Sequence, residues 1–396
     1  MVDVIGGLYP ILCRFIMKTH HWLLVMSLVG CRAESVAPVA KPDPVSSVLT
    51  IDLDKLPSYA PVYPPHYTPA VRGTDNTPAS NPVTDIGATL GRVLFYDTQL
   101  SRNRTVSCAT CHVQSVGFSD TRIRSVGFEG GLTGAHSMRL TNTRFFANGT
   151  MFWDRRSPNL EDQATKPIQD PLEMGFDAAH GGMGAVIGRM GDLTYYPPLF
   201  KAAFGDPAIT EDRIQRALAQ FVRSMVSVNS AFDSGLASVG GNLGADFPNY
   251  TTQQNLGKRL FLTPASPAST GAAGCASCHV PPTFALSAGS RGNGLDLNQT
   301  TVFKSPSLKS VALDGAFMHD GRFSTLHQVV RHYNTGIQAG PSLDNRLRGA
   351  PGPDGSQPLR LNLSEAQIDA LVAFMQTLTD EPLRTDPKFS DPFIRD

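Results

Sequence analysis

The sequence predicts a mainly α-helical chain that contains two tandem copies of one structural unit. The pentad C-x-x-C-H occurs twice, at 108–112 and 275–279, and a similar helix-forming segment precedes each copy. Signals for strands are weak along the chain. With 396 residues, the chain is long enough for two or three domains.

Composition is that of an ordinary globular protein and excludes one class of partner. Hydrophobic residues make up 41% of the chain, and 34 basic residues balance 34 acidic ones. There is no basic patch or charged tail, which predicts that nucleic acid is not a partner. Thirty prolines and 36 glycines predict many turns and long loops around short helices.

Residues 1–30 are predicted to be a lipoprotein-type signal peptide, with Met17 as the true start. A positive residue follows Met17, and then an apolar run that is too short to span a membrane. Residues 28–31 read Leu-Val-Gly-Cys and resemble a lipobox, in which Cys31 becomes the lipidated first residue. These signals predict a periplasmic protein held at the membrane through Cys31. An ordinary cleaved signal or a membrane anchor is the alternative.

Residues 31–82 are rich in proline, which keeps a chain extended, and are predicted to be a tether. We expect its second half to lie along the protein surface. The globular part should open at Thr84, a good helix N-cap. A glycine-rich stretch at 235–245 predicts the boundary between a first domain over 83–245 and a second over 246–396.

Each unit is predicted to open and to close with a helix. Residues 90–95 read Leu-Gly-Arg-Val-Leu-Phe, residues 256–261 read Leu-Gly-Lys-Arg-Leu-Phe, and each run precedes its pentad by a similar distance. The closing helices start at Thr210 and Ser364, each a hydroxyl N-cap followed by a glutamate that suits the helix dipole. Apolar residues of each closing helix share one face. This order indicates a duplication.

The pentads are the attachment signature of c-type haem. Two thiols join the haem vinyl groups, and the adjacent histidine becomes the proximal ligand of the iron. A zinc site would need further ligands at suitable spacing, and none follows. We therefore predict two tandem cytochrome c-like domains, each with one covalently bound haem c. The predicted ligands are Cys108, Cys111 and His112 for the first haem, and Cys275, Cys278 and His279 for the second.

Longer motifs lie between and after the pentads. The first half contains Phe-Trp-Asp-Arg-Arg at 152–156 and Pro-Ile-Gln-Asp-Pro-Leu-Glu-Met-Gly at 167–175. The second half contains Phe-Lys-Ser-Pro-Ser-Leu at 303–308 and Phe-Met-His-Asp-Gly-Arg-Phe at 317–323. From about residue 85 to residue 380, the chain resembles the bacterial di-haem cytochrome c peroxidases and the related MauG-type enzymes.

The resemblance implies that the first haem meets hydrogen peroxide. It places Glu173 beside that haem to move a proton between the peroxide oxygens, with Gln163 as a hydrogen-bonding neighbour. A carboxylate suits this role in a partly dry pocket, because burial raises its pKa toward the working pH. It also implies that Trp153 carries electrons between the haems, which is compatible with a packing role. The alternatives are a surface carboxylate for Glu173 and polar packing for Gln163.

The resemblance implies that the second haem is six-coordinate and handles electrons. Spacing from the 317–323 motif places Tyr333 where the peroxidases have a methionine ligand, with Met318 as the alternative and His332 nearby. Tyrosine here resembles the MauG-type enzymes, and a phenolate oxygen stabilises ferric iron more than a thioether does. Three roles are open for His136. It is a switchable ligand of the first haem, a residue that takes the place of a calcium-binding asparagine of the peroxidases, or a surface histidine. One calcium ion is implied between the domains, with oxygens from Asn142 and from residues 314–316.

Three functions follow. The first is a peroxidase that takes electrons from a small periplasmic donor such as a cytochrome c or a cupredoxin. The second is a MauG-type enzyme that oxidises residues of a partner protein, which Tyr333 favours. The third is a di-haem electron carrier without catalysis, which the context of Glu173 and Gln163 disfavours. The sequence leaves open whether the protein forms a homodimer.

Overall fold

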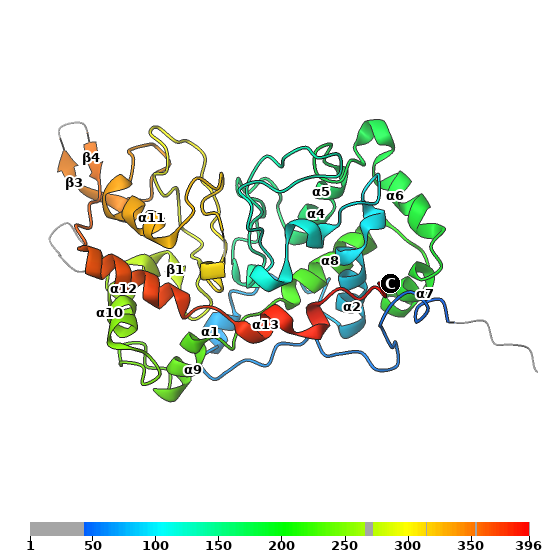
Figure 1. Cartoon of the computed structure of the whole chain (residues 1–396), viewed down its shortest axis with the longest axis horizontal. Coiled ribbons are helices and arrows are strands. Elements are labelled where there is room, and N and C mark those ends of the chain that lie inside the picture. Colours follow the sequence, from blue (N-terminus) through cyan, green and yellow to red (C-terminus); the bar gives the residue numbers. More distant parts are fainter. Residues whose placement is uncertain (1–42, 266–271, 314, 353–354, 396) are drawn as a thin grey trace, which may run out of the picture. The chain divides into compact units, whose positions relative to one another are not determined.

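A computed structural model describes residues 43–265, 272–313, 315–352 and 355–395 (Figure 1). The described chain is mainly helical, with long loops and short strands, which confirms the predicted fold class. The α-helices are α1 (Pro69–Arg72), α2 (Asp85–Tyr96), α3 (Cys108–Cys111), α4 (Leu160–Ala164), α5 (Lys166–Gln169), α6 (Gly182–Gly191), α7 (Tyr196–Phe204), α8 (Glu211–Ser224), α9 (Ala231–Ser238), α10 (Thr252–Leu262), α11 (Leu326–Arg331), α12 (Glu365–Gln376) and α13 (Glu381–Thr385).

The remaining elements are short. Strands β1 (His279–Val280) and β2 (Ala285–Leu286) form one antiparallel pair, and β3 (Arg348–Gly352) and β4 (Gly355–Pro358) form another. A π-helical turn, η7, covers His332–Gly336. The 3₁₀ turns are η1 (Thr98–Leu100), η2 (Gln114–Val116), η3 (Thr143–Phe145), η4 (Ala178–His180), η5 (Cys275–Ser277), η6 (Val311–Leu313), η8 (Asn345–Leu347) and η9 (Pro387–Phe389).

Helices α2 and α8 pack against each other in the first half of the chain. The hydroxyl of Thr84 caps α2 by accepting a hydrogen bond from the Gly87 amide at 3.0 Å. A Cβ atom at Gly91 would lie 2.0 Å from the carbonyl oxygen of Ala217. Only glycine therefore allows the two helices to approach so closely.

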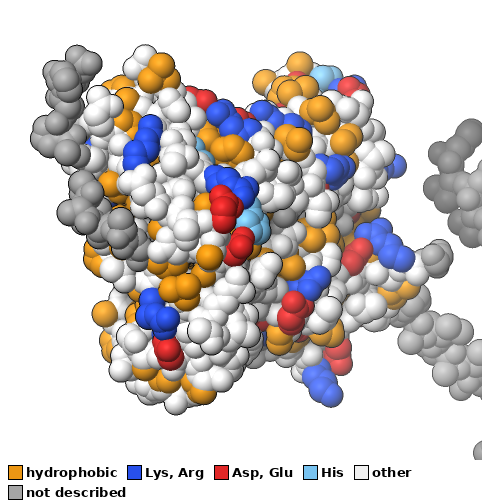
Figure 2. Space-filling model, turned by 60° about the vertical axis from the view of Figure 1, so that its left-hand side comes forward, with side chains coloured by type: hydrophobic (Ala, Val, Ile, Leu, Met, Phe, Trp, Pro, Cys, Tyr) orange, Lys and Arg blue, Asp and Glu red, His pale blue; other side chains and the backbone are white. Residues whose placement is uncertain are grey.

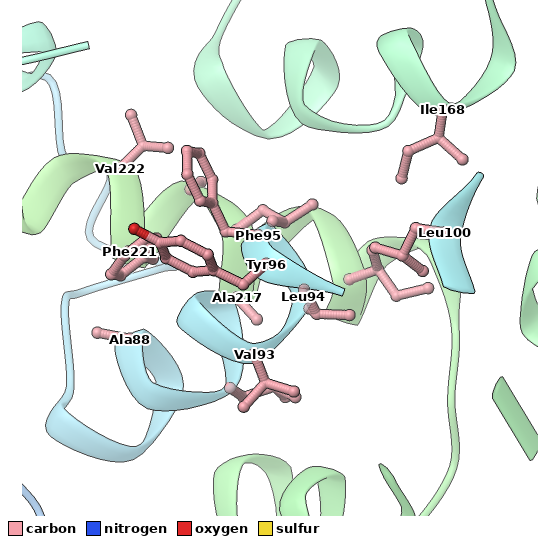
Figure 3. Close-up of a cluster of buried hydrophobic side chains, with 14 of the residues drawn as sticks. Ala88, Val93, Leu94, Phe95, Tyr96, Leu100, Ile168, Ala217, Phe221 and Val222 are labelled. Atoms are coloured by element: carbon pink, nitrogen blue, oxygen red, sulfur yellow. The ribbon is translucent and has the colours of Figure 1, made fainter. Parts of the chain in front are cut away.

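The α2–α8 contact is the centre of the first hydrophobic core. Leu94 and Phe95 of α2 lie in one cluster with Ala217 and Phe221 of α8 (Figure 3). The rings of Phe95 and Phe221 meet edge to face, with centroids 5.3 Å apart. Burying an aromatic side chain of this size contributes about 1.5–3 kcal/mol, so the contact anchors the segment that leads to the first pentad.

Helices α10 and α12 repeat this arrangement in the second half. Thr251 and Ser364 cap the two helices, each in a capping box. A Cβ atom at Gly257 would lie 1.8 Å from the carbonyl oxygen of Ala370. The glycine, the facing alanine and the close approach therefore occur at corresponding places in the two halves, as expected of a duplication.

Both ends of the described chain pack on the first core. Tyr59 donates a hydrogen bond to the carbonyl of Lys388 at 2.8 Å, and its ring meets that of Phe389 at 6.0 Å. Val45 is fully buried in the same core, although it lies in the range predicted as a tether. Helix α9, with Phe232, packs in the second core. The domain division at 245 and 246 remains a proposal.

The predicted signal peptide, including Met17 and Cys31, lies outside the described residues. Within the described ranges, every helix is too short or too polar to cross a membrane. On the face drawn in Figure 2, basic and acidic side chains lie beside one another, with apolar side chains between them. This interspersion is in keeping with the formal charge of zero.

Candidate functional site

The first pentad lines a cavity of about 450 Å³. Its two thiols, Cys108 and Cys111, are free and half-buried at the two ends of helix α3. The predicted site residues Trp153, Gln163 and Glu173 line the same cavity. The fold thus brings together side chains that lie up to 65 residues apart.

The imidazole of His112 is held in one orientation. Its Nδ1 atom donates a hydrogen bond to the carbonyl of Phe118 at 3.1 Å. Burial lowers the pKa of His112, so the ring is neutral near pH 7. The Nδ1 hydrogen bond leaves Nε2 as the nitrogen that can bind a metal, which is the arrangement common among histidine ligands.

Glu173 lies in the loop after helix α5. Its amide donates to the Asp170 carboxylate at 3.1 Å, a contact that fixes the turn. Burial raises the pKa of the Glu173 carboxyl to about 7; the nearby Asp170 charge raises this pKa further, and Arg156 opposes the rise. The carboxyl can therefore hold or release a proton near neutral pH. Gln163 reaches the cavity from helix α4.

The second pentad lines another cavity, of about 330 Å³. Cys275 and Cys278 are free and half-buried at the turn η5, and His279 begins β1. Burial lowers the pKa of His279 to about 4, so this imidazole is neutral as well. Tyr333 and Met318 also line the cavity.

Of the three residues considered as the second ligand, His332 differs from the others. Its Nε2 atom donates to the carbonyl of Asn293 at 3.1 Å, and the side chain does not line the second cavity in the described structure. Tyr333 lies on the π-helical turn η7, where burial raises the pKa of its phenol and the thiols Cys278 and Cys275 raise it further. π-Helical turns are frequent at functional sites.

The two cavities share a wall. Trp153 and His319 both line both cavities, and their rings meet edge to face with centroids 6.4 Å apart. Backbone hydrogen bonds join the wall across the two halves: the Lys304 amide donates to the Trp153 carbonyl at 2.6 Å. The full set of shared residues is His136, Met138, Trp153, Phe303, Lys304 and His319.

Trp153 and His319 occupy corresponding positions in two similar turns. One turn is closed by the bridge between Met151 and Ser157, and the other by the bridge between Phe317 and Phe323. The residue before each ring has a positive φ, 67° at position 152 and 72° at position 318. In the sequence, His319 stands out only as part of the motif at 317–323. Alignment of Trp-Asp at 153–154 with His-Asp at 319–320 would have indicated its position.

His136 lies in the wall and is 4% exposed, so the alternative of a surface histidine is wrong. Its backbone carbonyl accepts a hydrogen bond from Trp153 Nε1 at 2.7 Å, and its amide donates to the carbonyl of His319 at 2.9 Å. The ring Nδ1 donates to the Arg122 carbonyl at 3.0 Å, whereas Nε2 is buried without a hydrogen bond. His136 therefore positions the indole of Trp153.

One of the oxygen atoms predicted to bind calcium forms a hydrogen bond within the protein instead. The Asn142 side-chain oxygen accepts from the Ser227 amide at 2.9 Å, and its nitrogen donates to the Thr283 carbonyl at 3.2 Å. Residue 314 lies outside the described residues. Within the described ranges, no three side chains of His, Cys, Asp or Glu gather as a metal site.

Each cavity thus offers two free thiols and a neutral imidazole, the set that covalent haem attachment requires.

Comparisons with known proteins agree with two haem sites. The sequence model described as di-haem cytochrome c peroxidase matches residues 86–239 and 251–346. The methylamine utilization protein MauG of Methylorubrum extorquens is 36% identical over 321 residues, which cover 77% of this chain and 81% of the relative.

Two further matches cover most of the chain. Cytochrome c551 peroxidase of Nitrosomonas europaea is 28% identical over 328 residues, which cover 78% of this chain and 83% of the relative. The crystal structure of a MauG-like protein associated with microbial copper homeostasis matches with a TM-score of 0.64 and 28% identity, over 85% of this chain and 98% of that one. This chain therefore belongs to the di-haem cytochrome c peroxidase family of oxidoreductases, and its two C-x-x-C motifs imply two c-type haems.

Proposed function

We propose that this chain reduces hydrogen peroxide to water at its first haem, with electrons that enter through the second. The observation that carries the proposal is the position of Glu173, which lines the first cavity together with Cys108, Cys111 and His112. The acid that lines the second cavity, Asp344, is instead paired with Arg346 at 2.8 Å. Bound haem would supply an iron that takes peroxide and exchanges electrons.

Glu173 would move the proton on which the reaction depends. Reduction of one peroxide molecule to two water molecules consumes two protons and two electrons. As a carboxylate, Glu173 accepts the proton of the near peroxide oxygen and then returns it to the far oxygen, which leaves as water. Its pKa of about 7 makes both transfers accessible near neutral pH. The Gln163 side chain lines the same cavity, and its amide would donate a hydrogen bond to peroxide.

Trp153 would connect the two cavities for electrons. Its ring lines both cavities, and hydrogen bonds fix it at two points, through Nε1 to His136 and through its carbonyl to the Lys304 amide. His279, with Tyr333 or Met318, would hold the second iron. Two protein ligands would leave no open site for peroxide, which would suit electron transfer.

The proposal is tested by Glu173→Gln in the holoenzyme. We expect peroxide turnover to fall by about a hundredfold or more, the usual contribution of a general acid or base, while both haems remain attached. Glu129→Gln is the matched control, because the Glu129 side chain is 65% exposed and pairs with Arg102 at the surface. Undiminished turnover in Glu173→Gln with full haem content would contradict the proposed proton transfer.

A second candidate is a MauG-type enzyme that oxidises residues of a partner protein. Tyr333 favours it, because this side chain lines the second cavity and the sequence resemblance aligns it with the methionine ligand of the peroxidases. The two candidates differ in their substrate. Steady-state turnover with a reduced small cytochrome or cupredoxin would support the peroxidase, and oxidation of a partner protein without such turnover would support the MauG-type enzyme.

We propose a periplasmic protein held at the membrane by a lipid on Cys31, which mass spectrometry of the purified mature chain would detect.

A bound calcium ion is proposed from the family resemblance alone. Metal analysis of the holoenzyme before and after dialysis against a chelator tests it.

A further inference from the structure

A cluster of two tyrosines and one aspartate lies in the first core, outside both cavities. Asp97, at the end of helix α2, accepts hydrogen bonds on Oδ2 from the phenol of Tyr195 at 2.7 Å and from that of Tyr196 at 2.6 Å. Its Oδ1 accepts from the Gln99 amide at 2.8 Å. All three side chains of the cluster are at most 5% exposed.

The cluster is suited to move a proton. Burial raises the pKa of the Asp97 carboxyl, although the two phenol hydrogen bonds oppose the rise. Burial also raises the pKa of both phenols, so each holds its proton. One carboxylate oxygen therefore faces two neutral phenols at short distance. A phenol that loses an electron in a dry site must lose its proton, because an isolated buried charge is costly.

The cluster also extends outward from the first haem site. Tyr196 is fully buried in the first hydrophobic core, and Cys108, a predicted haem attachment point, packs against the same core. The rings of Tyr196 and Tyr195 have centroids 4.6 Å apart. Tyr195 in turn meets Phe393 edge to face at 5.9 Å, in the C-terminal segment at the surface. The aromatic series thus runs from the core beside the first pentad to the exterior.

We propose that Tyr196 and Tyr195 form a redox-active pair, with Asp97 as their shared proton acceptor, that carries an oxidising equivalent from the first haem toward the surface. The inference rests on the proposed reaction with peroxide, which supplies the oxidant. It adds a third redox site, which either removes an excess oxidising equivalent from the cavity or delivers it to a donor at the surface.

The steps balance in electrons and protons. A haem bound at the first site would supply a one-electron oxidant after reaction with peroxide. Tyr196 would give up one electron to it; the phenol O–H bond breaks, and the proton binds Oδ2 of Asp97. The products are a neutral tyrosyl radical and a neutral carboxylic acid. An electron then passes from Tyr195 to the radical, the Asp97 proton returns to Tyr196, and the Tyr195 proton moves to Asp97. Loss of the electron makes the negatively charged cluster neutral, and the second transfer leaves it neutral.

The chain provides a matched control in Tyr96. Tyr96 belongs to the same core and is 8% exposed, but its phenol donates to the carbonyl of Phe389 at 2.6 Å. A backbone carbonyl does not accept a proton at neutral pH, so oxidation of Tyr96 has no comparable acceptor. Substitution of Tyr96 by phenylalanine should leave radical formation at the pair unchanged.

The test is EPR of the full-length holoenzyme, frozen at intervals after hydrogen peroxide is added. We expect an organic radical whose hyperfine splitting narrows when the protein contains ring-deuterated tyrosine. Tyr196→Phe and Asp97→Asn should each reduce the yield by about tenfold or more, since the amide keeps the shape of the carboxylate but accepts no proton. Tyr96→Phe should retain the wild-type yield.

The haem absorbance of the same samples separates this inference from the proposed function. A spectrum that responds to peroxide without any deuterium-sensitive radical would overturn the tyrosine pair and leave the peroxidase intact. A spectrum that does not respond would overturn both. The labelled wild-type protein contains no substitution, so the result holds even where a variant folds poorly. A full radical yield in folded Tyr196→Phe and Asp97→Asn would also overturn the inference.

Discussion

The indole of Trp153 and the imidazole of His319 meet edge to face at 6.4 Å, each from the same position of a duplicated turn. The duplication therefore supplies the boundary between the two cavities with one ring from each half. Trp153 Nε1 is fixed by the carbonyl of His136, whose amide in turn donates to the carbonyl of His319. Hydrogen bonds thus join the two loops of the wall into one unit.

Trp153→Phe should slow electron exchange between the haems. Phenylalanine keeps a ring but removes the hydrogen bond to His136, and it is much harder to oxidise than an indole. We expect the second haem to respond to peroxide at least about tenfold more slowly in stopped-flow absorbance, while the first haem reacts at its normal rate. Phe152→Leu, a neighbour that lines the first cavity, is the control. Equal rates for wild type and Trp153→Phe would remove the indole from the path.

The reaction with peroxide should depend on pH through Glu173. Burial raises the pKa of this carboxyl to about 7, and the ionised form accepts the peroxide proton. The rate should therefore rise as pH increases through 7 and reach a plateau above it. Glu173→Gln should be slow, without this transition. Gln163→Leu should slow the reaction but leave the pH midpoint of the rate unchanged. A wild-type rate that stays constant over about pH 5.5 to 8.5, a range centred on the pKa of Glu173, would refute proton transfer by Glu173.

Substitutions of Tyr333 and Met318 should identify the second ligand. A thioether in place of a phenolate stabilises ferrous iron, so Tyr333→Met should raise the reduction potential of the second haem if Tyr333 is the ligand. Met318→Leu should then leave the potential unchanged. Spectroelectrochemical titration of both variants decides between them. The opposite pattern would assign Met318, whose sulfur accepts a hydrogen bond from the Asn293 amide at 3.4 Å.

Gly91→Ala and Gly257→Ala should each destabilise the protein. Each added methyl would lie within 2.0 Å of a carbonyl oxygen on the facing helix, so the helices must separate. We expect the Tm of the affected half to fall by roughly 5 °C or more. Gly184→Ala is the control, because a methyl at Gly184 in helix α6 meets open space. Alanine there should keep or slightly raise the Tm.

Much of the fold could be predicted from local patterns. The Thr84, Thr210 and Ser364 N-caps were each expected, and each accepts a hydrogen bond from the first turn of its helix. The similarity of the runs at 90–95 and 256–261 predicted the duplication, and in the structure the glycine of each run permits the same close helix contact. Capping depends on residues within one helical turn, and the duplication shows as two similar short runs, so a single sequence reveals both.

The structure adds contacts between distant segments. The burial of Val45 and Tyr59, and the ring contact of Tyr59 with Phe389, depend on both ends of the described chain meeting on the first core. The buried position of His136 depends on its hydrogen bonds with Trp153 and His319. Neither composition nor spacing specifies such contacts, because each requires two segments to be placed against each other by the rest of the fold.

By itself, the sequence determined the helical class, the duplication and the two haem pentads, because each depends on residues within about one or two helical turns of one another. Only the tertiary structure decided that Glu173 lies in a cavity dry enough to raise its pKa, and that Trp153 and His319 form one wall. Desolvation and ring contact depend on everything that surrounds a group. The two pentads are alike as sequences, and their surroundings make the two sites different.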